Sequence, residues 1–410
     1  MRKGNRKRKR ICFFGHFGSP NFGNEITIQT VLYHVRRHFP EADIVCICTG
    51  HEALAATHEI ETVPINRTFV KSGKLHSRLA RLLRRVFIGG PSEICRWFET
   101  FKTLKGADVL IIPGTGLLTD AYGLLGWGPY NLFKWSLVAR VCRCKLLFVS
   151  VGAGPIYGPL GRYFIKSALS MADFKSYRDD ASLKYLKSIG FSTNSDRIYP
   201  DLVFSLPEAM LPHEGDRKGM RSIVGLGLMP YAGKYSVVNP SDSTYQEYLE
   251  SLVTFAGWLL ANDYDIRLLI GEVSDTSAAK EFKSLLKASL GEYDEERIVD
   301  QATFCAEQLL SQLAATDTVV ATRFHNVLLA LLLNKPVIAI SFHHKCASLM
   351  SQMGLSQYCH DINHMNAGKL IEQFQDVERN AEKLKRAISE RVAQSRKALG
   401  EQYSLIFKGV

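Results

Sequence analysis

Short apolar runs alternate with longer amphipathic stretches along most of the chain. An apolar run at residues 9–16 is followed by a helix-like stretch at 25–39 and a second apolar run at 42–49. This alternation predicts β-α-β units and a parallel, doubly wound α/β sheet. The same pattern predicts strands at 107–114, 145–152 and 173–179 and helices at 130–143, 160–171 and 180–188.

The periodic pattern stops at residues 206–220, where prolines, glycines and charged residues gather. A second α/β series follows, with strands at 222–229, 265–271, 297–300, 316–322 and 336–341. Its helices are expected at 243–262 and 306–315, with one more that ends near residue 290 and another that begins at residue 324. We expect a basic disordered tail at 1–10, an N-terminal domain at 11–205, a linker at 206–220, a C-terminal domain at 221–375 and helices at 376–410 that could cross back to the first domain. Two Rossmann-like domains in this order resemble the GT-B arrangement.

Composition places the chain among globular proteins. It has 410 residues, of which 46% are hydrophobic and 22% are charged, which suits two folded domains. No apolar run reaches the roughly 20 residues of a membrane span, and we expect no secretory signal and a cytoplasmic location. The nine cysteines include no C-x-x-C pair, so we expect reduced thiols and no zinc.

The net charge of +11 is concentrated at the start of the chain. Residues 2–10 supply seven basic side chains, which leaves +4 for the remainder. A second basic stretch at 74–87 has the spacing of an amphipathic helix, with leucines on one face and Lys and Arg on another. The helix could rest on the anionic inner face of the cell membrane. Alternatively, its basic side chains could be solvated while its leucines pack on the core. We expect no nucleic-acid binding, because no recognised module accompanies these charges.

The first candidate site is the loop after the first strand. Asn21, Gly23, Asn24 and Glu25 lie between a strand and a helix start, where glycines allow close backbone approach and the helix N-terminus favours an anion. The same residues could simply form a tight turn and cap the helix.

Two further candidates follow later strands of the first domain. Gly114, Thr115 and Gly116 could bind substrate through their backbone, and Asp120 could grip or deprotonate a sugar hydroxyl, although a turn with a capping Asp is the simpler alternative. Arg178 could hold a carboxylate or phosphate, or it could pair with a neighbouring Asp. Asp201 is either a site residue or a turn former.

The most informative segment runs from 316 to 345. Arg323 and His325 stand between a buried strand and a buried helix, where polar groups are costly unless they are paired or functional. Lys345 follows the next strand. The three residues predict an anion-binding catalytic site. Neighbouring His343 and His344 do not predict a metal, since adjacent residues rarely aim at one ion.

Taken in order, the segments GSPNFGNEI, DVLIIPGTGLL, SYRDDAS, YPDLVF and TRFHNVLLALLLNKPVIAIS with the following HHK resemble the motif set of polysaccharide pyruvyl transferases over residues 11–358. The RFHN segment with Lys345 is the most specific part. Position 24 departs from the family pattern, because Asn24 replaces an acidic residue. We therefore expect this loop to bind a ligand or cap the helix rather than to act as a base.

The resemblance implies transfer of pyruvate from phosphoenolpyruvate to two hydroxyls of one sugar in a cell-surface polysaccharide or lipid-linked glycan. Arg178, Arg323 and Lys345 would hold the phosphate and carboxylate, and His325 would act as general acid and then base. The scheme needs no metal or organic cofactor. Acceptor specificity is expected in loops at 52–72 and 114–130.

Two alternatives stay open. A GT-B glycosyltransferase could bind the phosphates of a nucleotide sugar with Arg323 and Lys345 and its ribose with Glu272. A non-catalytic glycan-assembly protein would keep the fold without turnover, and the substitution at Asn24 favours it slightly.

Overall fold

The computed structural model describes residues 8–67, 90–121, 123–125, 128–193, 196–212, 221–230, 242–342 and 344–409. The chain forms two compact units. Unit 1 contains Met1–Ser19, Val31–Asp201 and Gln402–Val410, and unit 2 contains Pro20–Thr30 and Leu202–Glu401. The first unit gives way to the second between Asp201 and Leu202, just before the predicted linker at 206–220. Three predicted segments lie wholly or partly outside the described residues: 213–220 of the linker, 1–7 of the tail and the helix at 74–87.

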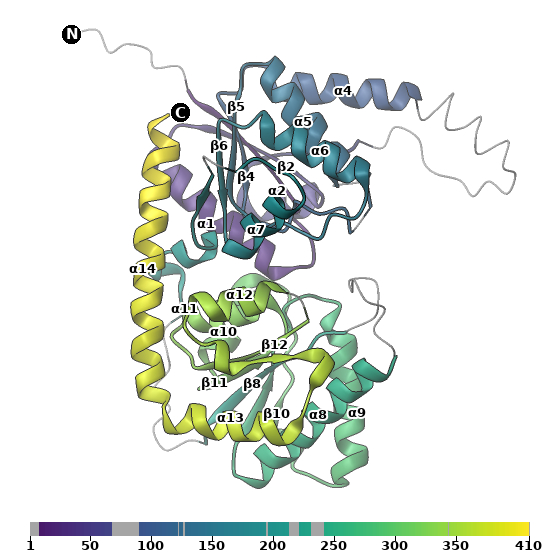
Figure 1. The fold of residues 1–410 in the computed structure, drawn as a ribbon. Coiled ribbons are helices and arrows are strands. Elements are labelled where there is room, and N and C mark those ends of the chain that lie inside the picture. The colour runs from purple at the N-terminus through teal and green to yellow at the C-terminus, as the bar shows by residue number, and fades with distance from the viewer. Residues whose placement is uncertain are drawn as a thin grey trace, which may run out of the picture. The chain divides into compact units, whose positions relative to one another are not determined.

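Unit 1 is built on a parallel sheet with the strand order β3-β2-β1-β4-β5-β6-β7 (Figure 1). The central strands β1, β4 and β5 are buried except at the first residue of β1 and β5, and Ile11 of β1 pairs with Ile44 of β2 on one side and Val109 of β4 on the other. The order reverses between β1 and β4, which is the switch point where ligands gather in such sheets. The strands are β1 Arg10–Gly15, β2 Asp43–Cys48, β3 Glu61–Pro64, β4 Val109–Pro113, β5 Lys145–Val151, β6 Phe174–Tyr177 and β7 Arg197–Ile198.

The helices that follow these strands are α1 Phe22–His38, α2 His51–His58, α4 Gly90–Leu104, α5 Pro129–Val141, α6 Pro159–Ser170 and α7 Asp180–Ser188. Trp135 of α5 and Phe148 of β5 are among the largest side chains of the core of unit 1.

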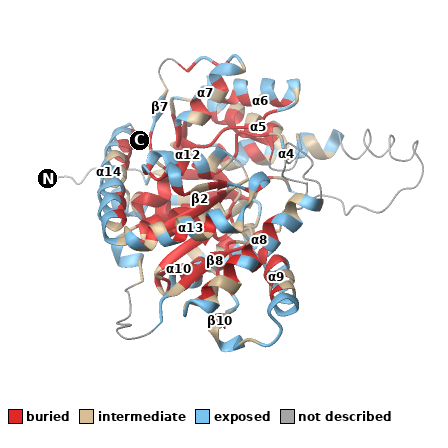
Figure 2. Cartoon of the chain, turned by 60° about the horizontal axis from the view of Figure 1, so that its bottom comes forward, coloured by how far each residue is buried: buried red, intermediate tan, exposed pale blue. Residues whose placement is uncertain are grey.

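Unit 2 repeats the plan with the strand order β10-β9-β8-β11-β12-β13, again parallel throughout. Buried residues run along its strand β8, as they do along β2 of unit 1 (Figure 2). The strands are β8 Ile223–Gly227, β9 Asp265–Leu268, β10 Ile298–Val299, β11 Thr318–Ala321, β12 Val337–Ser341 and β13 Cys359–Asp361.

The helices of this part of the chain are α8 Asp242–Ala261, α9 Asp275–Leu290, α10 Ala306–Ala314, α11 Phe324–Leu332, α12 His344–Gln352, α13 Ala367–Arg379 and α14 Ala381–Lys408. Short 3-10 helices occur at η2 Leu202–Ser205, η3 Glu208–Met210, η4 Glu295–Arg297, η5 Ser356–Tyr358 and η6 Ile362–His364. From Gln402 onward α14 belongs to unit 1, where Tyr403 stacks on His34 with ring centroids 4.2 Å apart.

The expected fold class, two Rossmann-like α/β domains, is confirmed. Two expectations about elements are wrong. Residues 52–64, expected as part of a loop at 52–72, instead contain most of α2 and the whole of β3, which pairs with β2. The C-terminal helices begin at Ala367 rather than 376, because Asn366 accepts a hydrogen bond from the Lys369 amide and caps α13. Among the described residues, no helix combines the length and apolar character that crossing a bilayer requires.

Candidate functional site

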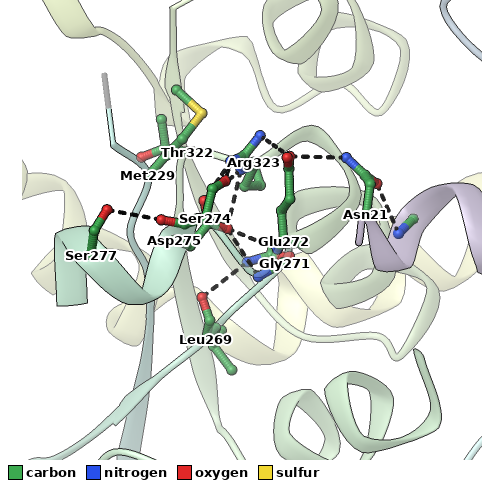
Figure 3. Close-up of polar contacts among 12 residues, drawn as sticks. Asn21, Met229, Leu269, Gly271, Glu272, Ser274, Asp275, Ser277, Thr322 and Arg323 are labelled. Atoms are coloured by element: carbon green, nitrogen blue, oxygen red, sulfur yellow. Dashed lines mark hydrogen bonds and ion pairs between the residues drawn. The ribbon is translucent and has the colours of Figure 1, made fainter. Parts of the chain in front are cut away.

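Three segments of unit 2 meet at the carboxyl end of its sheet (Figure 3). They are the start of α1, the loop after β9 and the loop after β11. The Phe22 amide donates to the Gly271 carbonyl at 3.2 Å, and the Val273 amide donates to the Pro20 carbonyl at 3.1 Å. This antiparallel bridge places the Asn21 loop, which follows the first strand of the chain, beside residues some 250 positions later.

Arg323 lies at the centre of this arrangement, directly after β11. Its Nη1 is 2.7 Å from Glu272 Oε2, and its Nε donates to Asp275 Oδ1 at 3.0 Å. Its Nη2 also donates to Ser274 Oγ at 3.2 Å. A guanidinium held by two carboxylates is fixed in orientation, and its positive charge is balanced locally. The predicted role of Arg323 in holding an anion stays a prediction.

Asp275 is fully buried beneath Arg323 at the start of α9. Its Oδ2 accepts hydrogen bonds from the backbone amides of Gly271 and Glu272, at 3.1 and 2.9 Å. Burial raises the pKa of the Asp275 carboxyl to about 6, against the opposing effect of Arg323. Asp275 therefore changes charge closer to neutral pH than an exposed aspartate does.

Asn21 caps α1 and also joins the Arg323 cluster. Its Oδ1 accepts from the Gly23 and Asn24 amides at 3.1 and 3.3 Å, and its Nδ2 donates to Glu272 Oε2 at 3.3 Å. Asn24 and Glu25 then lie half-buried in the first turn of α1. The amide at position 24 is thus next to the cap rather than the capping group itself.

Gly23 and His325 are in direct contact. A β-carbon at position 23 would lie 1.9 Å from His325 Nδ1, so only glycine lets the backbone of α1 approach this ring. His325 is half-buried in the first turn of α11, and its ring packs edge-on against Phe324 at 5.2 Å. Two residues that the sequence pointed to in separate motifs are therefore neighbours.

Lys345 lies half-buried in the first turn of α12. Strands β11 and β12 are hydrogen-bonded neighbours, so α11 with His325 and α12 with Lys345 begin at adjacent strand ends. Positive helix N-termini and a lysine at one sheet edge can attract an anion.

Several residues that support this edge were missed by sequence reasoning. Asp275 and Ser274 contact Arg323 from 48 and 49 positions earlier. Asn326 is fully buried, donates to the Leu269 carbonyl at 3.4 Å and lies against Gly271. Asn326, a polar residue directly after His325 in an apolar helix, was the one sequence signal for these supporting residues. Asp275 gave none, because an Asp at a helix start is too common to indicate an ion pair.

Buried hydroxyls hold the strand end before Arg323. Tyr248 Oη is 2.8 Å from Thr322 Oγ1, and it accepts a hydrogen bond from the Met229 amide at 3.3 Å. Burial raises the pKa of Tyr248 to about 12. Tyr248 therefore stays neutral at physiological pH.

The remaining predicted residues lie in unit 1. Gly114 packs against the Ser150 carbonyl, where a β-carbon would come within 2.4 Å, and Thr115 is buried beside it, ahead of Gly116. Asp120 accepts hydrogen bonds from the Tyr157 and Gly158 amides at 2.8 and 2.7 Å, directly before α6. These contacts hold the loop that leads into α6, and the predicted role of Asp120 at a sugar hydroxyl stays a prediction.

Arg178 is also paired. Its Nη1 donates to Asp201 Oδ2 at 3.2 Å, and its Nε is 3.5 Å from Asp179 Oδ2. The side chain is only 4% exposed. Its predicted role in binding phosphoenolpyruvate stays a prediction. The structure thus brings Asn21, Gly23, Glu272, Arg323 and His325 together in unit 2, while Arg178, Asp120 and residues 114–116 belong to unit 1.

Over the described part of the chain, no three His, Cys, Asp or Glu side chains gather in a way that could hold a metal ion.

Residues 21–344 match a family model described as polysaccharide pyruvyl transferase. The amylovoran biosynthesis protein AmsJ of Erwinia amylovora is 21% identical over 414 residues, which cover 94% of this chain and 96% of AmsJ.

Solved structures match the fold along nearly the full length. A putative UDP-N-acetylglucosamine 2-epimerase from Listeria monocytogenes has a TM-score of 0.60 at 11% identity, with 93% of this chain and 91% of that chain covered. HepE of Anabaena in complex with UDP has a TM-score of 0.59 at 13% identity, with 98% and 100% covered. At such identities these likenesses concern the fold alone.

Proposed function

Because the chain belongs to the polysaccharide pyruvyl transferase family, we propose that it moves pyruvate from phosphoenolpyruvate onto two hydroxyls of one sugar as a cyclic ketal and releases phosphate. The name of AmsJ refers to the biosynthesis of amylovoran. We therefore propose a cell-surface polysaccharide or its lipid-linked precursor as the acceptor.

The observation that carries the proposal is the packing of His325 in the first turn of α11 against Gly23 at the start of α1. An imidazole is suited to give and take a proton near neutral pH. His325 would donate a proton to the methylene carbon of phosphoenolpyruvate, so that C2 becomes electrophilic. One sugar hydroxyl then adds to C2, the C2–O bond to phosphate breaks, and the second hydroxyl closes the ketal. The imidazole accepts one hydroxyl proton, and the departing phosphate can carry the other.

Charge on the departing phosphate requires fixed positive groups. The N-terminus of α11 and Lys345 at the start of α12 are our candidates in unit 2. Arg323 is bound by Glu272 and Asp275, which supports a positioning role for it: the guanidinium fixes the loop after β9 beside His325. Asn21 extends that support to the start of α1.

The nucleotide-sugar alternative needs Glu272 for the donor ribose. Its Oε2 atom instead binds Arg323 Nη1 and Asn21 Nδ2, within the same unit. This observation does not favour the alternative, and we do not propose it.

The test uses the full chain with phosphoenolpyruvate and a panel of nucleotide-free and lipid-linked sugars. Released phosphate and acid-labile pyruvate on the sugar are measured. We expect His325→Gln to reduce sugar-dependent phosphate release by roughly 10²- to 10⁴-fold. The control is His364→Gln, because that histidine is highly exposed in the same unit.

Two results would overturn the proposal. The first is turnover of a nucleotide sugar with no phosphate release from phosphoenolpyruvate on any acceptor. The second is phosphoenolpyruvate binding without turnover, which would identify a non-catalytic protein.

A further inference from the structure

Helix α4 of unit 1 carries an exposed apolar stripe. Ile94 is 71% exposed and Phe98 is 74% exposed, and Phe101 continues the line. Their spacing of four and three residues places all three on one face of the helix. The opposite side is buried through Thr100 and Leu104. Large apolar side chains in a contiguous, exposed row are typical of a contact surface.

A polar network holds α4 in this orientation. The Trp97 ring N–H donates to Tyr130 Oη at 3.0 Å, and that hydroxyl donates to Glu93 at 2.8 Å. Lys134, whose side chain is fully buried, donates to the same Glu93 oxygen at 3.1 Å. These bonds hold the inner face of α4 against α5. The apolar stripe on the other face of α4 therefore points outward.

Helix α6 carries further exposed apolar side chains. α4 packs on α5, and α5 packs on α6, so the three helices form one layer (Figure 1). Leu160 and Tyr163 of α6 are more than half exposed. Phe164 beside them packs against Phe133 and Tyr130 of α5, with ring centroids 5.2 and 5.6 Å apart.

Most charges on these three helices are basic. α4 carries Arg96 and Lys102 beside Glu93 and Glu99, and α5 carries Lys134 and Arg140 with no acidic residue. Arg162 and Lys166 flank Tyr163, and α6 contains no acidic residue. A second copy of this chain would bring like charges together, whereas an anionic surface complements them. Aromatic side chains with nearby Lys and Arg are also the composition of segments that lie in a lipid interface.

We propose that unit 1 docks onto an anionic lipid bilayer through the outer faces of α4 and α6. The stripe Ile94, Phe98 and Phe101, with Leu160 and Tyr163, would enter the headgroup region, and the basic residues would meet anionic lipids. This surface goes beyond the proposed function, since binding to lipid needs neither donor nor acceptor sugar.

The experiment is co-sedimentation of the full chain with vesicles of phosphatidylcholine alone or mixed with phosphatidylglycerol. We expect binding to the mixed vesicles that weakens with salt. The double variant with Ile94→Ser and Phe98→Ser should bind on the order of tenfold or more weakly, since two inserted apolar side chains are lost. The matched control is Phe304→Ser, which removes a 79% exposed aromatic side chain of unit 2.

Three results would overturn the proposal: equal binding by the double variant, an equal loss in Phe304→Ser, or a dimer in solution that only the double variant dissociates, without vesicle binding. Unchanged thermal unfolding would show that the double variant folds. Phosphate release with a soluble sugar acceptor, measured in parallel, separates a failure of docking from a failure of the proposed reaction.

Discussion

Each sheet places one arginine at the carboxyl end of a strand, beside a glycine and two carboxylates. In unit 1 Arg178 follows β6, lies against Gly152 and pairs with Asp179 and Asp201. In unit 2 Arg323 follows β11, lies against Gly271 and pairs with Glu272 and Asp275. The two clusters share their chemistry and differ in their access to solvent.

The Arg178 side chain is 4% exposed, whereas the Arg323 side chain is 20% exposed. Asp201 is as buried as Arg178, but Glu272 shares the partial exposure of Arg323. A fully buried ion pair mainly fixes structure, because any ligand would have to break it. A partly exposed ion pair can hold a loop in place and still contact a substrate. We infer that the Arg178 cluster holds the end of the sheet in unit 1, and that the Arg323 cluster holds the candidate site.

Breaking the buried cluster is expected to have the largest effect on stability. Arg178→Met leaves Asp179 and Asp201 buried without their cation, which should lower the free energy of unfolding by about 3–5 kcal/mol. Chemical denaturation measures this change. The control Arg140→Met removes an exposed ion pair with Asp173 in the same unit and should cost about 0–1 kcal/mol.

The same substitution in unit 2 tests the contrast between the clusters. Arg323→Met should cost less stability than Arg178→Met, because Asp275 can take up a proton near neutral pH and keeps its two backbone donors. Activity should nevertheless be lost. Equal losses of stability in the two variants would contradict the distinction drawn between the clusters.

The sequence was sufficient to predict most of the sheets. Long apolar runs such as 107–114 and 145–152 became β4 and β5 with ends shifted by at most two residues. The strands β3, β7 and β13, which lie at the edges of the two sheets, were missed. Their length of two to four residues is not a sufficient reason, because the two-residue β10 was predicted. β3 needs its neighbour β2 to exist as a strand, and that contact is not visible in local sequence.

The titration of Asp275 offers a second way to sharpen the comparison. Its pKa is raised from 3.8 to about 6 in the folded protein, so the folded state binds this proton more tightly than the unfolded chain. The resulting stabilisation is complete below pH 3.8 and is lost as the pH rises through 6. Relative to Asp275→Asn, the wild-type protein should lose up to about 3 kcal/mol between pH 4 and 7.

Urea unfolding of both proteins across that pH range gives the difference directly. Asp317→Asn is a suitable control, since that aspartate lies in the same unit and also accepts a hydrogen bond from a backbone amide, that of Ile223 at the start of β8. A constant difference between wild type and Asp275→Asn at all pH values would contradict the raised pKa.

The contact of Gly23 with His325 has a smaller expected effect on stability and a specific effect on activity. Gly23→Ala puts a methyl group within 1.9 Å of the ring, and the shift that relieves it should cost about 1–3 kcal/mol. Sugar-dependent phosphate release should fall by more than the loss of folded protein accounts for, because the substitution displaces His325. Gly400→Ala in α14 is the matched control: a β-carbon there meets no described atom within 4 Å, so we expect about 0.5–1 kcal/mol of stabilisation.

The candidate site was only partly predictable, for reasons that differ between residues. Arg323 and His325 were found because polar groups between buried elements are costly without a purpose. The ion pair of Arg323 with Asp275 joins positions 48 apart, and no local pattern indicates it. Asn21 was correctly placed at a helix start, where an asparagine caps by default, but its second bond to Glu272 depends on the tertiary fold.

The smallest effect is expected at Asp120, where unit 1 offers a further contrast with unit 2. Asp120 binds the amides of Tyr157 and Gly158 ahead of α6, as Asn21 binds two amides at the start of α1, but only Asn21 also contacts the Arg323 cluster. Asp120→Ala removes these two hydrogen bonds, so it should cost about 1 kcal/mol of stability and leave sugar-dependent phosphate release unchanged. Asn21→Ala should cost a similar amount and also reduce release. A loss of turnover in Asp120→Ala beyond its loss of stability would instead support contact between Asp120 and the acceptor sugar, and would extend the functional residues into unit 1.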